Sequence, residues 1–519
     1  MRRLILTTVI VTVGFMVQQA ISDADLVFDS EGYNSGKYGQ DPHQYYYSTG
    51  ITSPLLLVNY WDLFQTGDSS YIFLTLKDPD DSVSAGPAIY RAKDLSLVYS
   101  QPRWSSAHDA HIGHFNGNDY LVFIAQSGIG GPSMNCLLYD STYTLAYNIS
   151  SHSPADATIG LHECQLTDVG SAPMILKEII SFNLTSVGGP EDGKVLDNII
   201  QEIDIESNDL LWMWRASEHY ELLESYMDYK HGPGAYDYIH MNSAERVNGN
   251  FLISARHTHS ITFIDRESGN IVWTLGGKKN DFVDISGGNA TSFAWQHHAR
   301  FNDADLTQLT LFDNHNISSK IGCTVDCSRG KHIELNYDNH TARLVSEFYH
   351  PESLISAFEG SHQITRSGNV FLGWGANPTF TEYTPSGECV LDVQFDLWRP
   401  EKGYPINYRA YKMNWKAYPT WDPQIAVLEG GIDGQFKVYV SWNGATEVTR
   451  WRLLVGTSNN SVTKAVIEVP RAAFETEILL KSDQHLVRAA ALDKDGHVLG
   501  MTEIAQLAAG GGAINTFRG

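Results

Sequence analysis

Histidines recur at the starts of apolar segments along much of the chain, and their type and spacing suggest acid, base or nucleophilic chemistry. The sequence holds 20 histidines. An imidazole can exchange a proton near neutral pH, and its neutral form is a nucleophile. The segments are His108-Asp109-Ala110-His111, Leu161-His162-Glu163, Ile239-His240-Met241-Asn242-Ser243, Arg256-His257-Thr258-His259, Gln296-His297-His298-Ala299-Arg300, Asp313-Asn314-His315 and Gly360-Ser361-His362-Gln363.

A repeated strand pattern is what could bring these histidines together. Between residues 249 and 275, a Gly-Asn pair, an apolar run, a second run, a Gly-containing turn and a third run follow in order. Residues 368–395 repeat that order, and weaker copies occur at 71–100, 120–149 and 308–348. Short runs of β-branched and aromatic residues between Gly and Asn turns are typical of antiparallel strands.

This self-similarity predicts an all-β fold, a β-propeller in which neighbouring blades bury each other's faces. A segment of roughly 370 residues at about 50 residues per blade gives about seven blades, with six as the other possibility. The innermost strand of each blade would line one central channel, so the histidines would form a ring there. A single histidine in a strand is equally well explained as a hydrogen-bonded structural residue, but the recurrence favours a site.

The chain divides into five expected parts. Residues 1–22 have two arginines, an apolar centre and small residues at the end, which is the layout of a secretory signal peptide, so we expect a secreted, extracellular protein. The propeller would occupy residues 23–396, and a connector rich in Pro, Tyr and Trp residues 397–422. Alternating short strands then predict a small β-sandwich of the fibronectin type III kind at 423–510, followed by a tail at 511–519.

Charge and cysteine content narrow the class of protein. The net charge is −24, from 36 lysines and arginines against 60 acidic residues, which argues against nucleic-acid and anionic-membrane partners. Six sequons fit a glycosylated product.

Five cysteines without zinc-site spacing fit an oxidising compartment. Cys323 with Cys327 and Cys136 with Cys164 are the candidate bridges, and Cys389 would be left over. Nothing indicates the oligomeric state.

Several motifs in the same order resemble the fungal branch of the arylsulfotransferase family, over about residues 71–395. The motifs are His162-Glu163, the HMNS box at His240, the stretch ISAR to WTLGG, Gln296-His297, LFDN at 311–314, Ser328-Arg329-Gly330 and Gly373-Trp374-Gly375. The resemblance implies a propeller with its active site in the central channel. It implies two enzymatic activities.

The first implied activity is sulfuryl transfer between phenols through a sulfated histidine, as in the bacterial members. By this resemblance His240 and His297 match channel histidines and Arg329 matches the arginine that stabilises the anion. Only His362 offers a partial match to the nucleophile. The chain lacks the GxxxxGK[ST] loop of a nucleotide-dependent transferase, so we expect no nucleotide cofactor.

The second implied activity is that of a secreted polysaccharide lyase, which releases rhamnose from the 4-position of a glucuronate in gum arabic side chains. Such β-elimination needs a base and groups that neutralise the uronate carboxylate. We expect His108 as the base, with His162 and His240 positioning a uronic-acid-containing glycan. The residues expected to bind the carboxylate or the sugar are His297, Arg300, Arg329, Arg256, Asn242 and His362.

Of the two activities the sequence favours the lyase, because we expect a secreted, glycosylated protein, the GxxxxGK[ST] loop is missing, and the nucleophilic histidine is not placed by the motifs. A Ca²⁺ ion in the channel would suit Asp, Asn and carbonyl oxygens, although no loop signature identifies its ligands. A third hypothesis is a non-catalytic propeller that binds a glycan or a protein. The abundance of channel histidines argues against that hypothesis, because a pure binding site would more naturally use aromatic residues.

Overall fold

Almost all regular structure in the computed structural model is β-strand, as expected for an all-β fold. The structure describes residues 23–77, 85–126, 134–152, 158–230, 234–398, 407–430 and 435–507. The expected signal peptide at 1–22, the tail at 511–519 and part of the 397–422 connector lie outside the described residues.

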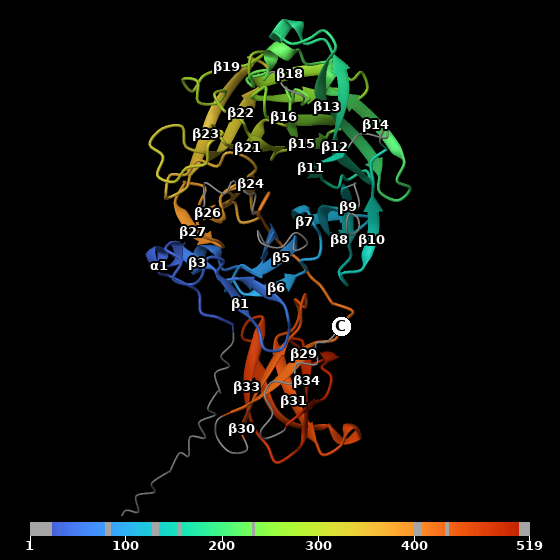
Figure 1. Ribbon diagram of the computed structural model, residues 1–519, viewed down its shortest axis with the longest axis vertical. Helices are drawn as coiled ribbons and strands as arrows, with labels where there is room; N and C mark the ends of the chain where they lie inside the picture. Colours follow the sequence, from blue (N-terminus) through green and yellow to red (C-terminus); the bar gives the residue numbers. More distant parts are fainter. Residues whose placement is uncertain are drawn as a thin grey trace, which may run out of the picture.

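Six sheets, most of their strand pairs antiparallel, are arranged around a common centre in the described chain (Figure 1). In order from the inner to the outer strand, the first three are β28 (Tyr411–Met413), β4 (Tyr71–Leu76), β5 (Gly86–Arg91), β6 (Leu97–Ser100); β7 (Ala107–Phe115), β8 (Asn118–Gln126), β9 (Met134–Tyr139), β10 (Leu145–Ile149); and β11 (Thr158–Cys164), β12 (Ser171–Phe182), β13 (Gly193–Asp204), β14 (Leu210–Arg215).

The other three sheets continue the ring. They are β15 (Met241–Val247), β16 (Asn250–Ala255), β17 (Ser260–Ile264), β18 (Ile271–Gly276); β20 (His297–Phe301), β21 (Gln308–Asp313), β22 (Arg329–Asn336), β23 (Thr341–Tyr349), β19 (Val283–Asp284); and β24 (Ser361–Ile364), β25 (Val370–Gly373), β26 (Thr379–Tyr383), β27 (Cys389–Gln394), β3 (Leu57–Trp61). The expected number was about seven or six, and the described residues form six such sheets.

The sheets stack face to face because each is apolar on both sides. One buried cluster joins Phe73 and Ile89 of the first sheet to Leu121 and Phe123 of the second. Corresponding clusters join the third sheet to the fourth and the fourth to the fifth. Burying both faces of every sheet in this way is what a propeller requires, since a single sheet of four strands has no core of its own.

Two distant segments close the ring. The strand β3 pairs with β27 as the outermost strand of the last sheet, whereas β28 pairs with β4 as the innermost strand of the first. The stretch expected to act as a connector therefore supplies one of the six inner strands. Its strand β28 pairs Lys412 with Ile72, and the Gln363 side chain of β24 donates to the Lys412 carbonyl at 3.1 Å and accepts from its N–H at 2.8 Å.

The C-terminal strands form two sheets around one apolar cluster. The strands are β29 (Gln424–Glu429), β30 (Gln435–Ser441) and β33 (Glu475–Lys481) in one sheet, and β32 (Lys464–Pro470), β31 (Arg450–Gly456), β34 (Leu486–Leu492), β35 (Val498–Met501) and β36 (Ala505–Gln506) in the other. Alternating short strands were expected at 423–510, and all of these strands lie within that range. The fibronectin type III assignment stays a prediction. Figure 1 places this domain beside β1, β5 and β6.

The remaining elements are short. They are α1 (Ser30–Asn34), α2 (Leu63–Thr66), the hairpin strands β1 (His43–Tyr45) and β2 (Thr52–Pro54), and the 3₁₀ turns at Thr185–Val187, Ala216–Glu218, Leu222–Glu224 and Asn459–Ser461. Disulfides join Cys136 to Cys164 and Cys323 to Cys327, and Cys389 is free, so the expected pairing is confirmed. No helix within the described ranges has the length and apolar character needed to cross a membrane.

Candidate active site in the central channel

Several of the inner strands are bent near their starts. The pairing register shifts within His108–His111 of β7, Met241–Ser243 of β15 and His297–Arg300 of β20. Asp109 and His298 have φ values of 62° and 55°, a left-handed conformation that side chains other than glycine rarely adopt. Such bulges re-aim side chains and occur often beside functional sites. Neighbouring residues of one strand can therefore both contribute to the centre of the ring.

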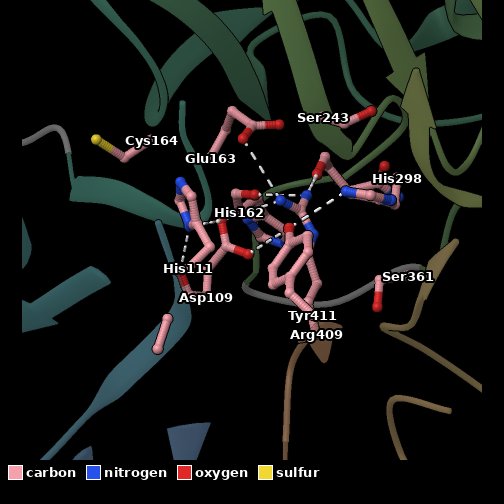
Figure 2. Close-up of polar contacts among 12 residues, drawn as sticks. Asp109, His111, His162, Glu163, Cys164, Ser243, His298, Ser361, Arg409 and Tyr411 are labelled. Carbon is pink, nitrogen blue, oxygen red and sulfur yellow. Dashed lines mark hydrogen bonds and ion pairs between the residues drawn. The ribbon is translucent and has the colours of Figure 1, made fainter. Parts of the chain in front are cut away.

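Arg409, in the segment just before β28, lies at the centre of this arrangement and is fully buried (Figure 2). Its Nη1 atom is 3.0 Å from Asp109 Oδ2 and 3.4 Å from Glu163 Oε1. Its Nη2 atom donates to the backbone carbonyls of His162 and Asn242, each at 2.8 Å. One guanidinium group thus connects three inner strands, β7, β11 and β15.

Asp109, Glu163, Arg300, Arg409 and Tyr411 form what we call the ion network. Arg300 Nη2 is 2.6 Å from Glu163 Oε2, and the Tyr411 hydroxyl donates to Asp109 Oδ1 at 3.0 Å. Two carboxylates therefore face two guanidinium groups in a buried setting, which is the arrangement that compensates the cost of desolvating charges. Because every charge has a partner, the ion network is best explained as the structural support of the channel.

A second group of side chains lies on the Tyr408 side of Arg409, and we call it the histidine cluster. The ring centroids of His108, His162 and His297 lie 6.0, 5.7 and 6.4 Å from that of Tyr408. The cluster extends to two further histidines, since His162 is 5.1 Å from His240, and His240 is 4.7 Å from His257. The expected ring of imidazoles thus has its counterpart in five histidines that come from four blades: His108, His162, His240, His257 and His297.

His240 is held by a carboxylate. Its Nδ1 atom lies 2.5 Å from Asp237 Oδ2, and since the carboxylate can only accept, Nδ1 carries the proton. The Nε2 atom is then an acceptor, and its only polar contact within the described chain is Lys177 Nζ at 3.5 Å. The His240 side chain is 22 % exposed, so a ligand can reach it. This is the geometry of an oriented base or nucleophile.

Two other histidines of the cluster use both ring nitrogens for structure. His257 donates from Nδ1 to the Asp237 carbonyl at 2.5 Å and accepts from Arg256 Nη1 at Nε2, at 2.7 Å. His297 donates from Nδ1 to Asn314 Oδ1 at 2.7 Å and accepts from the Glu359 backbone N–H at 3.2 Å. Both are also buried, so they suit orientation of neighbours better than proton transfer.

His108 and His162 are less constrained. His108 Nε2 is 2.8 Å from the Ser106 hydroxyl, which lies on the same segment. His162 Nδ1 is buried and has no hydrogen-bond partner among the described residues. Both rings are half-buried and contact Tyr408 edge-on. These two histidines therefore have fewer hydrogen bonds to the protein than His257 and His297.

Burial keeps the cluster neutral. Desolvation lowers the pKa of His108 to about 4, with a further contribution from Lys77, and lowers the pKa of His257 to about 3. The pKa of His240 is also lowered by desolvation, against the opposing effect of Asp237. Although burial alone would raise it, the pKa of Asp237 is held below its usual range by His240 and Lys177. At neutral pH the site therefore presents a neutral His240 and an ionised Asp237.

Two cations border the histidine cluster. Arg256 lies over the Trp295 ring at 5.2 Å and donates from Nη2 to the Ala357 carbonyl at 3.0 Å. Its Nε atom is buried without a hydrogen-bond partner, and no carboxylate forms an ion pair with it in the described residues. Lys177 on β12 lies 3.6 Å from Asp237 Oδ2. Arg256 and Lys177 can thus receive the negative charge of a substrate.

Asp237, His240 and His257 are also close enough together to hold a metal ion, since one ligand atom of each lies within 4.8 Å of the others. Lys177 Nζ lies 3.2 Å from His240 Nδ1, and Arg256 already donates to His257. Two adjacent cations oppose the binding of a third. The arrangement therefore fits an anionic substrate better than a metal.

The structure brings together five of the residues proposed from the sequence and separates four others. His108, His162, His240, His297 and Arg256 belong to, or border, the histidine cluster. Arg300 pairs with Glu163 and lines a different cavity of about 290 Å³, together with His111, His298 and Tyr411. The side chain of Asn242 donates to the Gln296 carbonyl.

Arg329 and His362 have other partners. Arg329 pairs with Asp313 and Glu347, each at 3.0 Å. His362 is buried, donates from Nδ1 to the Leu311 carbonyl at 3.2 Å and packs against Phe348. Neither contacts the histidine cluster in the part of the chain that the structure describes.

Sequence reasoning missed Asp237, Lys177, Tyr408 and Arg409. One signal could have identified the last two: Tyr408-Arg409-Ala410-Tyr411 has the same form as His108-Asp109-Ala110-His111 and His297-His298-Ala299-Arg300, with alanine in the third place. Asp237 lies three residues before His240, where no periodic pattern marks it. Lys177 sits on a long strand whose blade did not stand out as a repeat.

A family model described as arylsulfotransferase (ASST) matches residues 128–396. No curated protein sequence matches the chain.

Similar solved structures include a protein of unknown function from Bacteroides caccae, at 10% identity, with 67% of this chain and 99% of that chain covered and a TM-score of 0.40. TolB from Acinetobacter baumannii (10% identity, 67% and 67% covered, TM-score 0.35) and the periplasmic gluconolactonase PpgL of Pseudomonas aeruginosa (10% identity, 79% and 99% covered, TM-score 0.33) are also similar. At this level of similarity none carries a functional inference.

Proposed function

The chain belongs to the arylsulfotransferase (ASST) family, and we propose that it transfers a sulfuryl group from one phenol to another, with His240 as the carrier. One observation carries this proposal: the Nε2 atom of His240 is an oriented, neutral and accessible acceptor beside two cations. A neutral imidazole nitrogen is a competent nucleophile, and a hydrogen-bonded carboxylate fixes its tautomer.

The reaction takes place in two displacements at sulfur. In the first, His240 Nε2 forms a bond to the sulfur of an aryl sulfate, the sulfur–oxygen bond to the ring breaks, and the phenolate leaves. In the second, the oxygen of an acceptor phenol attacks the sulfur, the nitrogen–sulfur bond breaks, and the acceptor proton passes to a neutral histidine of the cluster. His108 and His162 are the candidates for this role, since His108 Nε2 contacts only the Ser106 hydroxyl and His162 Nδ1 has no partner among the described residues.

Negative charge on the sulfuryl oxygens would be stabilised by Arg256 and Lys177. Burial lowers the pKa of Arg256 to about 10, so the guanidinium stays protonated at neutral pH. Both side chains are fixed in place, Arg256 by Trp295 and Lys177 by Asp237. Cations that are already positioned lower the energy of a developing charge without reorganisation.

Elimination at a uronate, the lyase activity expected from the sequence, is the second candidate function. It is favoured by the same pair of cations, since Arg256 is an arginine without a carboxylate partner in the described chain and could bind a uronate carboxylate. In that reaction a neutral histidine would take the proton beside the carboxylate, and the sugar oxygen at the 4-position would leave. Release of rhamnose from glucuronate caps is the specific form that we expected.

Parallel assays with three proteins test the two candidates. Wild type, His240→Ala and the control His497→Ala are given a nitrophenyl sulfate with a phenol acceptor, and separately gum arabic. His497 forms an exposed pair with Asp493 at 3.1 Å, so it controls for loss of an Asp–His pair away from the channel. We expect sulfate transfer by wild type and His497→Ala only, and a mass increase of one sulfuryl group on the peptide containing His240 in the absence of acceptor.

Other outcomes have definite meanings. An unsaturated uronate and free rhamnose from gum arabic, without sulfate transfer, would establish the lyase and refute the transferase. Equal transfer by His240→Ala and wild type would remove His240 as carrier. No turnover on a panel of aryl sulfates and uronate glycans, with retained glycan binding, would favour a non-catalytic propeller.

A further inference from the structure

A cavity of about 230 Å³ lies between the first propeller sheet and the C-terminal domain, away from the channel. The propeller side contributes residues 68–71 at the start of β4, the end of β5 and the turn that follows, and the domain side contributes the segment just before β31 and the residue just after β32. The lining residues that matter are Tyr71, Arg91, Lys93, Thr446, Thr449 and Arg471. Three of these six side chains are cationic.

Arg471 matters most among them because no carboxylate forms an ion pair with it in the described residues, and Asp94 and Asp23 act on its charge only at longer range. Its Nε atom donates to the Ala473 carbonyl at 2.9 Å and its Nη1 atom to the Ala445 carbonyl at 2.7 Å. The Nη2 atom is buried without a hydrogen-bond partner among the described residues. Arg471 also forms no ion pair with any of the described residues. A partly buried guanidinium that lacks an anion carries an uncompensated desolvation cost.

A second guanidinium increases that cost. Arg91 donates from Nη2 to the carbonyl of Ala472, the residue next to Arg471, at 3.2 Å. Desolvation and the charge of Arg91 lower the pKa of Arg471 to about 10. Asp94 neutralises Arg91 through an ion pair of 2.7 Å, but Arg471 and the exposed Lys93 remain. The cavity wall is therefore cationic on balance.

One carboxylate also lines the cavity and has to be counted. Asp68 accepts from the Ser70 backbone at 2.8 Å and lies 3.4 Å from Lys412 Nζ, a buried lysine of the propeller. The charge of Asp68 is thus paired with a lysine of the propeller. It does not compensate Arg471, with which it forms no ion pair in the described residues.

We propose that this cavity binds a small tetrahedral oxyanion, sulfate or phosphate, between the propeller and the C-terminal domain. Arg471 and Thr449 of the domain and Arg91, Lys93 and the Tyr71 hydroxyl of the propeller supply donors from both sides. Oxyanions form short, charge-assisted hydrogen bonds with guanidinium groups. At roughly 30 Å³ per water molecule, the volume holds such an ion with part of its hydration.

The bound ion would stabilise the docked arrangement of the propeller and the C-terminal domain. An anion held by both sides binds only when the domains are docked, so it stabilises the docked form by mass action. This site takes no part in the proposed catalysis and stands independently of it.

Isothermal titration at constant ionic strength tests the proposal. Sulfate, phosphate and chloride are titrated separately into wild type, Arg471→Met and the control Arg488→Met, whose arginine donates to the Thr502 carbonyl in the same domain. Wild type and Arg488→Met should bind sulfate or phosphate saturably, and the affinities of the two ions show which is preferred. Loss of charge-assisted hydrogen bonds should weaken binding to Arg471→Met about tenfold or more.

The channel can also bind sulfate, so Arg256→Met is titrated as well. Binding that survives in Arg256→Met and is lost on adding Arg471→Met belongs to the interdomain cavity. Undiminished binding by Arg471→Met, with loss in Arg256→Met, would overturn the interdomain site and leave the proposed function untouched.

A direct measurement covers the case in which Arg471→Met does not fold. Wild-type crystals soaked in selenate should show an anomalous peak between Arg91 and Arg471. Absence of that peak, with selenate visible elsewhere in the same crystal, would refute the site.

Discussion

At the scale of single residues, the chemistry of the channel depends on which ring nitrogens are free. Five histidines gather in the cluster, yet His257 and His297 use both nitrogens in hydrogen bonds. His240 differs because its hydrogen bond to Asp237 uses only Nδ1, which keeps the proton. Residue type alone would give every histidine the same role, whereas the hydrogen-bond partners give each a different one.

Asp237→Asn tests the role of that carboxylate. An amide of the same shape can turn its NH₂ group toward Nδ1, which favours the tautomer with the proton on Nε2. We expect kcat to fall by roughly 10²–10⁴-fold while KM changes little. The measurement is steady-state kinetics on whichever substrate the parallel assays identify. Asp493→Asn, in the exposed Asp493–His497 pair, is the control. Full activity of Asp237→Asn would contradict the assignment.

The buried carboxyl group of Glu359 should make the stability of the folded protein depend on pH. Desolvation raises its pKa from the ordinary 4.5 to about 8, and its Oε2 atom is buried without a partner. Between these values the folded protein keeps a proton that the unfolded chain has released. The contribution of Glu359 to the free energy of unfolding is therefore fully present below pH 4.5. It falls by about 1.4 kcal/mol per pH unit above that value and is lost as the pH rises through about 8.

Glu359→Gln should remove this slope. Urea unfolding at several pH values between 4.5 and 8 should show the free energy of unfolding of wild type falling more steeply than that of the variant. The exposed Glu388→Gln serves as the control and should follow wild type. Parallel curves for wild type and Glu359→Gln would show that Glu359 is ionised in the folded protein.

At the scale of elements, the three-residue strand β28 decides whether the centre forms. It brings Tyr411 to Asp109, and the segment before it brings Arg409 to both carboxylates of the ion network. The Ser361 hydroxyl donates to the Ala410 carbonyl at 2.9 Å and accepts from its N–H at 3.1 Å. Ala410 lies directly against Gly373 of β25. The strand is thus located by its neighbours, since three residues have little preference of their own.

Gly373→Ala tests this docking. An added Cβ atom would lie 2.6 Å from Ala410 N and 2.7 Å from Ser361 Oγ, so the segment before β28 must move. We expect the free energy of unfolding to drop by about 1–3 kcal/mol, with a fall in activity because Tyr408 and Arg409 shift. Chemical denaturation and turnover are the measurements. At Gly50 a Cβ atom meets nothing within 4 Å, so Gly50→Ala should be neutral. Equal stability of both variants would contradict the argument.

At the scale of the whole molecule, segments from both ends of the chain hold the ring together. The strands β3 and β28 complete the last and the first sheets, and the C-terminal domain then binds the outer edge of the first. There the Asn443 side chain accepts from the Ser100 N–H and donates to the Ser100 carbonyl, each at 3.0 Å. One amide side chain thus pairs with the edge of β6 as a strand would.

Asn443→Ala should weaken the contact between the domains. Both backbone groups of Ser100 would lose their partner, which we expect to cost about 1–3 kcal/mol in the free energy of unfolding. Differential scanning calorimetry measures the shift. Asn460→Ala, an exposed position of the same domain, is the control. If both variants melt like wild type, the domains are held by other contacts.

The fold could be predicted well where the pattern is local. The three runs expected within 249–275 correspond to β16, β17 and β18, and those of the copy within 368–395 correspond to β25, β26 and β27. Alternation and Gly turns act over a few residues, so the sequence displays them. By contrast, β28 pairs with a strand from the opposite end of the propeller, and no local pattern reports such a pairing.

The sequence by itself determined the all-β repeat, two candidate disulfide pairs and a set of histidines expected at the centre, because periodicity, cysteine spacing and residue type are all local properties. Only the tertiary structure decided which of these residues meet. It placed His240 beside Asp237 and Lys177, and gave Arg300 and Arg329 carboxylate partners of their own. Charge and hydrogen bonding act between neighbours in space, and closing the ring makes distant segments of the chain into neighbours.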